Sequence, residues 1–159
     1  MPQHMKPEDF DPPEQRSLLA QEGYALMGAA FEVHRVLGGG LLEEIYQEAL
    51  EAELRLRGIP FVARQELAIE YKGNILRKSY VPDLYVHGAI VVELKCATTL
   101  AVEHEAQLMN YMRLSRKQVG YLINFAPLNG VQWKRFTFAE NIIVQSPPRP
   151  ERGLPSRSL

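Results

Sequence analysis

The sequence has little cysteine and no long apolar run, and each absence excludes a class of protein. Cys96 is the single cysteine, so no internal disulfide can form, and no group of cysteines and histidines has the spacing of a zinc site. No apolar run approaches the roughly 20 residues of a membrane-spanning helix, and the N-terminal residues lack the apolar stretch of a signal peptide. The sequence therefore predicts a cytoplasmic protein with no membrane association.

A strong positive charge is also missing. The 159 residues include 18 Lys and Arg against 19 Asp and Glu, which gives a net charge of −1. Net charge by itself therefore does not indicate a nucleic-acid-binding protein. A locally basic face stays compatible with this balance, because metal ions and a few basic side chains near a cleft can neutralise phosphate.

The length and the 46% hydrophobic content are sufficient for one domain with one core. Proline is concentrated near the two ends, where the hydrophobic pattern has no period. We expect a flexible tail over residues 1–13 and a second one, rich in proline and arginine, over residues 146–159. A single domain over residues 14–145 lies between them.

Hydrophobic periodicity predicts an α/β fold in which two helices precede three strands, and a third helix precedes two more strands. The three consecutive strands are expected to form an antiparallel meander, and the last helix lets the chain cross over, which gives a central mixed sheet flanked by helices. The predicted helices span residues 14–37, 41–57 and 100–114, and the predicted strands span 61–71, 75–86, 89–96, 119–125 and 131–138.

The strand at residues 89–96 carries a carboxylate and an ammonium group on one face. Alternate side chains of a strand share a face, so Glu93 and Lys95 project together from an otherwise apolar segment. An isolated Glu-x-Lys is a short motif, and a solvated strand end explains it equally well. Its context in the chain has to decide between the two readings.

Asp83 supplies that context. If the connection at His87 and Gly88 is a three-residue loop, Asp83 lies directly opposite Glu93; a two-residue loop would turn it to the other face. Two facing carboxylates need a neutralising partner, which can be a divalent cation together with Lys95. Hard oxygen ligands of this kind select Mg²⁺ or Mn²⁺.

Two of the predicted helices carry further candidates for the functional site. Glu43 lies in the first turn of the second helix, where an acid is favoured by the helix dipole, so this position alone does not establish a functional role. His104, Gln107 and Tyr111 form one polar stripe on the third helix, which can line a cleft or simply face solvent.

The sequence resembles the GxxExxY protein family, a prokaryotic branch of the PD-(D/E)xK nuclease superfamily with a restriction-endonuclease-like αβββαβ core, here with an extra N-terminal helix. The resemblance covers about residues 17–138. The motifs that carry it, in chain order, are Val33-His34, Gly40-Leu-Leu-Glu43-Glu-Ile-Tyr46, Pro82-Asp83, Glu93-Leu-Lys95, His104-Glu-Ala-Gln107-Leu-Met-Asn-Tyr111 and Gly120-Tyr-Leu-Ile-Asn124-Phe125.

The resemblance implies a role for each of these positions. Asp83 and Glu93 would bind the metal, with help from Glu43 and the backbone carbonyl of Leu94. Lys95 would position the attacking water and stabilise charge on the phosphate. Catalysis would thus rest on Asp83, Glu93, Lys95 and Gln107. The positions expected to touch substrate or to support the ligands are His34, Tyr46, His104 and Tyr111.

We therefore expect a Mg²⁺- or Mn²⁺-dependent nuclease that hydrolyses phosphodiester bonds with a metal-activated water. The expected partner is nucleic acid, with DNA favoured over RNA, and the protein can pair into a homodimer. The alternative is a non-catalytic nuclease-fold module that binds nucleic acid or a protein partner. A purely structural reading, in which the acids form ion pairs with Lys95 and arginines, also stays open.

Overall fold

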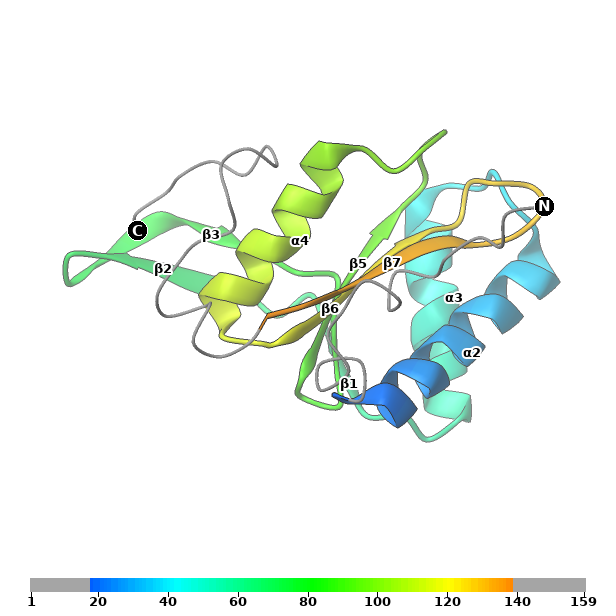
Figure 1. The fold of residues 1–159 in the computed structure, drawn as a ribbon, viewed down its shortest axis with the longest axis horizontal. Helices are drawn as coiled ribbons and strands as arrows, with labels where there is room; N and C mark the ends of the chain where they lie inside the picture. The colour runs from blue at the N-terminus through cyan, green and yellow to red at the C-terminus, as the bar shows by residue number, and fades with distance from the viewer. Residues whose placement is uncertain (1–17, 139–159) are drawn as a thin grey trace.

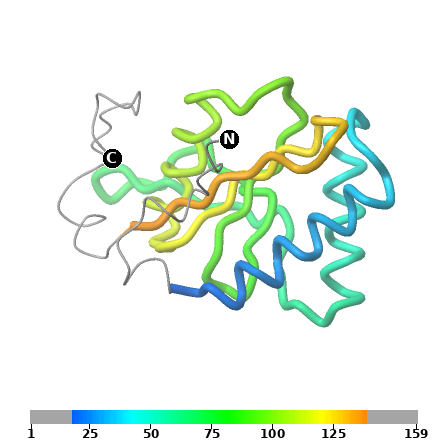
Figure 2. The backbone as a smooth tube through the Cα atoms, turned by 45° about the vertical axis from the view of Figure 1, so that its right-hand side comes forward, coloured from blue at the N-terminus to red at the C-terminus, as the bar shows by residue number. Residues whose placement is uncertain are grey.

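The computed structural model describes residues 18–138, which form a central five-stranded sheet, helices on both of its faces, and a separate two-stranded sheet. Helices α2 (Ala20–Leu37) and α3 (Glu43–Leu56) lie on one side of the central sheet, and α4 (Val102–Ser115) lies on the other (Figure 1). From a second direction, α2 and α3 again lie side by side and away from α4 (Figure 2). The molecule therefore has three layers.

The central sheet is mixed, with the strand order β1-β4-β5-β6-β7. β5 and β6 run parallel, which requires a crossover connection, and α4 forms it. The other neighbouring pairs are antiparallel. The mixed α/β fold class predicted from the sequence is confirmed. The strands are β1 (Phe61–Ala63), β4 (Leu84–Val86), β5 (Ile90–Lys95), β6 (Val119–Asn124) and β7 (Gln132–Thr137).

Alternate side chains of β5 belong to two apolar cores, one on each face of the central sheet. Val92 belongs to the larger core, which the sheet forms with α2 and α3. Val91 packs on the opposite face with Leu108 of α4. Because Glu93 and Lys95 follow Val91 at two-residue steps, both leave the strand on the α4 face of the sheet.

The antiparallel pairing of the predicted three-stranded meander is present, since β1 pairs with β4 and β4 pairs with β5, but two of its strands are broken. Arg64 has a left-handed backbone (φ 51°) that ends the strand predicted over 61–71, and Pro82, which has no N–H for a ladder bond, lies in the break of the strand predicted over 75–86. The outer halves pair with each other as a hairpin that extends away from the central sheet (Figure 1). These halves are β2 (Leu67–Tyr71) and β3 (Asn74–Tyr80).

The connection between β4 and β5 decides where the two acids lie. Val86 pairs with Ile90, so residues 87–89 form a three-residue loop and the two-residue alternative does not occur. Extending this register by one step beyond the end of β4 places Asp83 opposite Glu93. Asp83 therefore directly precedes the strand, whereas the sequence pattern placed it within a longer one.

Some boundaries differ from the sequence-based expectation. The first helix, predicted over 14–37, begins at Ala20 in the structure, after a turn at residues 18–19. The expected tails at 1–13 and 146–159 lie outside the described residues, as do the outermost parts of the domain expected over 14–145.

Candidate active site

Asp83 and Glu93 lie next to each other at the end of the central sheet where β4 begins. The backbone N–H of Asp83 donates a hydrogen bond to Oε1 of Glu93 at 3.0 Å. In return, the backbone N–H of Leu94 donates to Oδ2 of Asp83 at 2.7 Å. Each carboxylate thus accepts a hydrogen bond from a backbone N–H of the neighbouring segment, so both are fixed in position before anything binds.

The backbone of Asp83 is fixed as well. Its carbonyl oxygen accepts a hydrogen bond from Nε2 of Gln47 at 3.1 Å and another from the N–H of Arg64, also at 3.1 Å. Gln47 belongs to α3 and is only 3% exposed. Sequence reasoning missed Gln47, although it lies one helical turn after Glu43 and therefore on the same helix face.

Burial makes this acid pair electrostatically unfavourable without a cation. Glu93 is 3% exposed, and burial together with the charge of Asp83 raises the pKa of Glu93 to about 9. Burial also raises the pKa of Asp83, against the lowering effect of the Leu94 N–H, Lys95 and Arg64. At neutral pH the pair consequently keeps one proton that two exposed carboxylates would have released.

Lys95 is held by a polar chain on α4. Its Nζ donates a hydrogen bond to Oε1 of Gln107 at 2.8 Å, and Nε2 of Gln107 donates to the Tyr111 hydroxyl at 3.0 Å. The ring of Tyr80, at the end of β3, packs edge-on against Tyr111 with centroids 4.9 Å apart. The structure therefore joins three of the residues singled out from the sequence in one hydrogen-bonded chain beside the acid pair.

Glu43 lies near the pair but has a different environment. It is the first residue of α3 and its side chain is exposed. Partial desolvation and the charge of Asp83 raise the pKa of Glu43, while Lys95 and Arg64 lower it. Within residues 18–138, no three His, Cys, Asp or Glu side chains are grouped closely enough to hold a metal ion. The part of Glu43 in metal binding stays a prediction.

Tyr46 supports the loop that leads into α3. Its hydroxyl donates to the carbonyl of Gly38 and accepts the N–H of Leu41 at 3.1 Å, and its ring stacks on Phe125 with centroids 4.7 Å apart. The side chain is fully buried, so it cannot be reached by a substrate in this structure. Its contacts instead set the position at which α3, and with it Glu43, begins.

His34 and Gly39 hold the same loop against the turn after β6. Nε2 of His34 lies 2.7 Å from the carbonyl oxygen of Pro127. A Cβ atom at Gly39 would lie 2.4 Å from that same oxygen, so only glycine allows this close approach. His34 is therefore a packed histidine bonded to Pro127, and its role toward substrate or ligands stays a prediction.

His104 contributes to the start of α4. Its Nδ1 accepts a hydrogen bond from the N–H of Ala101 at 3.1 Å, so the side chain serves as part of a helix cap. The segment just after the C-terminal end of β5 is fixed by Asn124, which is fully buried: its Oδ1 accepts the N–H of Ala97 and its Nδ2 donates to the carbonyl of Ala97. The sequence motif contained Asn124 but gave it no role.

A comparison with family models decides the relationship. The model of the PD-(D/E)XK nuclease superfamily matches residues 20–136, which is most of the chain. The chain belongs to the PD-(D/E)XK nuclease superfamily. This confirms the superfamily inferred from the motifs, while the narrower resemblance to the GxxExxY branch stays a prediction. No curated protein sequence matches the chain.

Solved structures resemble this PD-(D/E)XK protein more distantly. The crystal structure of SSO0001 is 18% identical, with 84% of this chain and 67% of that chain covered and a TM-score of 0.49. An alkaline exonuclease (LHK-Exo) from Laribacter hongkongensis is 15% identical, with 79% and 85% covered and a TM-score of 0.39. Both scores are low, so the assignment to the superfamily rests on the family model.

Among residues 18–138, no helix combines the length and the apolar character needed to cross a bilayer.

Proposed function

We propose that this protein is a metal-dependent nuclease that hydrolyses phosphodiester bonds of nucleic acid, with Asp83 and Glu93 as the principal metal ligands. The observation that carries the proposal is the meeting of these two carboxylates, buried and held by backbone N–H groups, beside the ammonium group of Lys95. Membership of a nuclease superfamily supports the same conclusion.

The acid pair fits a divalent cation on its own chemistry. One oxygen of each carboxylate accepts a backbone N–H, and the raised pKa of Glu93 means that the pair keeps a proton at neutral pH. A cation would replace that proton and remove the repulsion between the charges. The ligands are hard oxygens, which suit Mg²⁺ or Mn²⁺, and Glu43 and the Leu94 carbonyl are the proposed further ligands.

The bound cation would supply polarisation of the phosphate and a lowered pKa for a water molecule. Lys95 would hold that water in position and stabilise negative charge that grows on the phosphate oxygens. Gln107 accepts a hydrogen bond from the Lys95 ammonium and so sets its direction, and Tyr111 sets the amide orientation of Gln107. Both helix residues thus act on the reaction through Lys95.

The proposal is tested by cleavage of DNA and RNA with Mg²⁺, with Mn²⁺ and with EDTA. We expect cleavage only with a divalent cation, and a loss of at least about 100-fold in Glu93→Gln and in Lys95→Met. Glu70→Gln and Lys72→Met are the matched controls, since both residues are exposed and belong to the β2–β3 hairpin and its turn. These two variants should retain wild-type activity.

Two outcomes would contradict the assignment. Cleavage that persists in both site variants would place the chemistry elsewhere. A wild-type protein that binds nucleic acid but cleaves none, with either cation, would favour the non-catalytic module. The domain limits of 14–145, a DNA substrate, a homodimer and a cytoplasmic location remain predictions from the sequence.

A further inference from the structure

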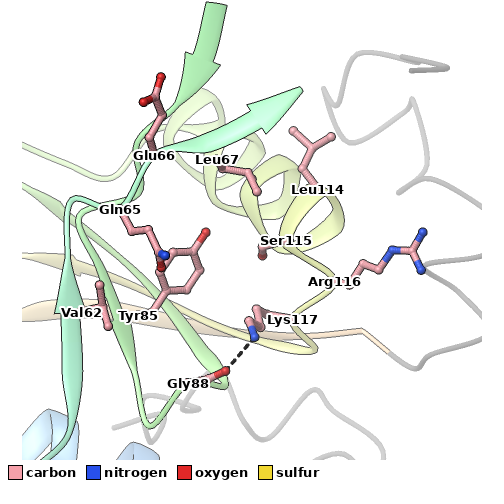
Figure 3. A pocket seen from close by; sticks show the side chains of 10 residues that line it. All are labelled: Val62, Gln65, Glu66, Leu67, Tyr85, Gly88, Leu114, Ser115, Arg116 and Lys117. Atoms are coloured by element: carbon pink, nitrogen blue, oxygen red, sulfur yellow. Dashed lines mark hydrogen bonds between the residues drawn. The ribbon is translucent and has the colours of Figure 1, made fainter. Parts of the chain in front are cut away.

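An open cavity of about 350 Å³ lies on the α4 side of the central sheet (Figure 3). Three segments line it: the connection between β1 and β2, the β4–β5 hairpin, and the end of α4. Tyr85 of β4 lines it, with Gln65, Gly88 and Ser115 around it. None of these residues takes part in the site described above.

The cavity and the acid pair share one face of β4. Tyr85 follows Asp83 by two residues, a step of about 6.6 Å along a strand that returns to the same face. Tyr85 packs in the core that contains Val91 and α4 residues, which agrees with this placement. An occupant of the cavity would thus lie one or two nucleotides from a phosphate at the acid pair.

The lining is mainly apolar, with a few polar groups at the edge. Val62, Leu67 and Leu114 contribute aliphatic surface, and Tyr85 contributes an aromatic ring. At the rim, Nζ of Lys117 donates a hydrogen bond to the carbonyl of Gly88 at 2.7 Å. A ligand pocket of this size and composition suits a flat heterocycle with polar edges.

We propose that this cavity binds the base of an unpaired nucleotide adjacent to the phosphate that is cleaved. The inference rests on the proposed nuclease function and specifies its substrate class: single strands, or duplexes with an unpaired end. Aromatic and aliphatic surface accommodates the face of a base, and the Gln65 amide can contact its edge.

A base fits the cavity better than a phosphate group does. Phosphate needs several donors, whereas most of the lining is apolar, and Arg116 and Glu66 point away from the hollow (Figure 3). The ammonium of Lys117 lies at the rim, where it can attract the phosphate attached to the bound nucleotide. In a duplex the faces of a base are covered by its stacked neighbours and its edge by its pairing partner, which limits the occupant to unpaired nucleotides.

Oligonucleotide binding tests the proposal. The full chain with Lys95→Met, which prevents cleavage, is titrated with Mn²⁺ and a fluorescein-labelled strand of eight deoxythymidines, or with a strand of the same backbone without bases. Anisotropy should show affinity for the thymidine strand at least about five-fold higher, the lower range of base–aromatic stacking. Adding Ser115→Leu fills the cavity and should remove this preference without changing binding of the abasic strand.

Two further variants secure the interpretation. Gln65→Ala, at an exposed residue between β1 and β2, should also weaken binding of the thymidine strand alone, and it tests the proposal if Ser115→Leu does not fold. Gln21→Leu adds the same leucine at an exposed position of α2, on the other side of the sheet, and should change nothing.

The outcomes separate this inference from the nuclease proposal. Equal binding of both strands, in a protein whose wild type cleaves DNA, would overturn the base-binding cavity and leave the nuclease intact. Failure to bind either strand, together with failure of the wild type to cleave, would overturn both.

Discussion

Replacing Glu93 with glutamine should stabilise the metal-free protein while it abolishes the proposed activity. The folded protein holds the Glu93 proton up to a pKa of about 9, whereas the unfolded chain releases it near the ordinary value of 4.5. The folded state therefore binds more protons than the unfolded state between these values. As the pH rises through this window, the free energy of unfolding must fall.

The magnitude follows from linkage. One proton contributes about 1.4 kcal/mol per pH unit, so the wild type should lose about 3 kcal/mol between pH 6 and pH 8 through this group. The raised pKa of Asp83 acts in the same direction at lower pH. Glu93→Gln removes the titrating group and keeps the hydrogen-bonding shape, so its unfolding free energy should change far less over this interval.

Urea unfolding in EDTA, followed by circular dichroism at several pH values, measures this difference. Because groups outside the acid pair titrate equally in both proteins, the difference between wild type and Glu93→Gln isolates the titration of the acid pair. Parallel pH profiles for the two proteins would refute the reasoning, since they would show that Glu93 has an ordinary pKa. Saturating Mn²⁺ at pH 8 should stabilise the wild type by about 3 kcal/mol at 100 times its Kd, and should stabilise the variant much less.

Three other substitutions test neighbouring parts of the account. Lys95→Met should reduce cleavage by about 100-fold or more in a gel assay and leave the unfolding midpoint nearly unchanged, because it removes a partly exposed charge that is not needed for packing. Gln47→Leu should weaken Mn²⁺ binding, measured by calorimetry, by about ten-fold, because the Asp83 carbonyl loses one of its two donors. Gly39→Ala should lower the unfolding free energy by about 1–3 kcal/mol in urea titration, because the new Cβ would press on the Pro127 carbonyl. Unchanged cleavage in Lys95→Met, unchanged Mn²⁺ affinity in Gln47→Leu or unchanged stability in Gly39→Ala would contradict the role given to that residue.

The sequence was sufficient to predict the elements whose hydrophobic pattern is long and regular. The helix at 41–57 and the strand at 89–96 have nearly the observed bounds, because burial of one face determines their period. The facing of Asp83 and Glu93 followed from a loop-length argument, and the observed three-residue loop agrees with it.

What the sequence missed depends on backbone geometry and on distant partners. The break at Arg64 has no glycine to mark it, since an arginine adopts the left-handed conformation there. Without that break, the separation of the β2–β3 hairpin from the central sheet cannot be foreseen. Gln47 was missed because its partner is a backbone carbonyl 36 residues away, which no side-chain pattern reports.

Anomalous scattering from a crystal of the wild-type protein with Mn²⁺ tests most directly whether the two carboxylates bind a metal ion. The account predicts one strong peak within coordination distance of both Asp83 and Glu93, with the Leu94 carbonyl beside it. A saturated crystal with no peak between these side chains, grown from protein that cleaves nucleic acid with Mn²⁺, would contradict it.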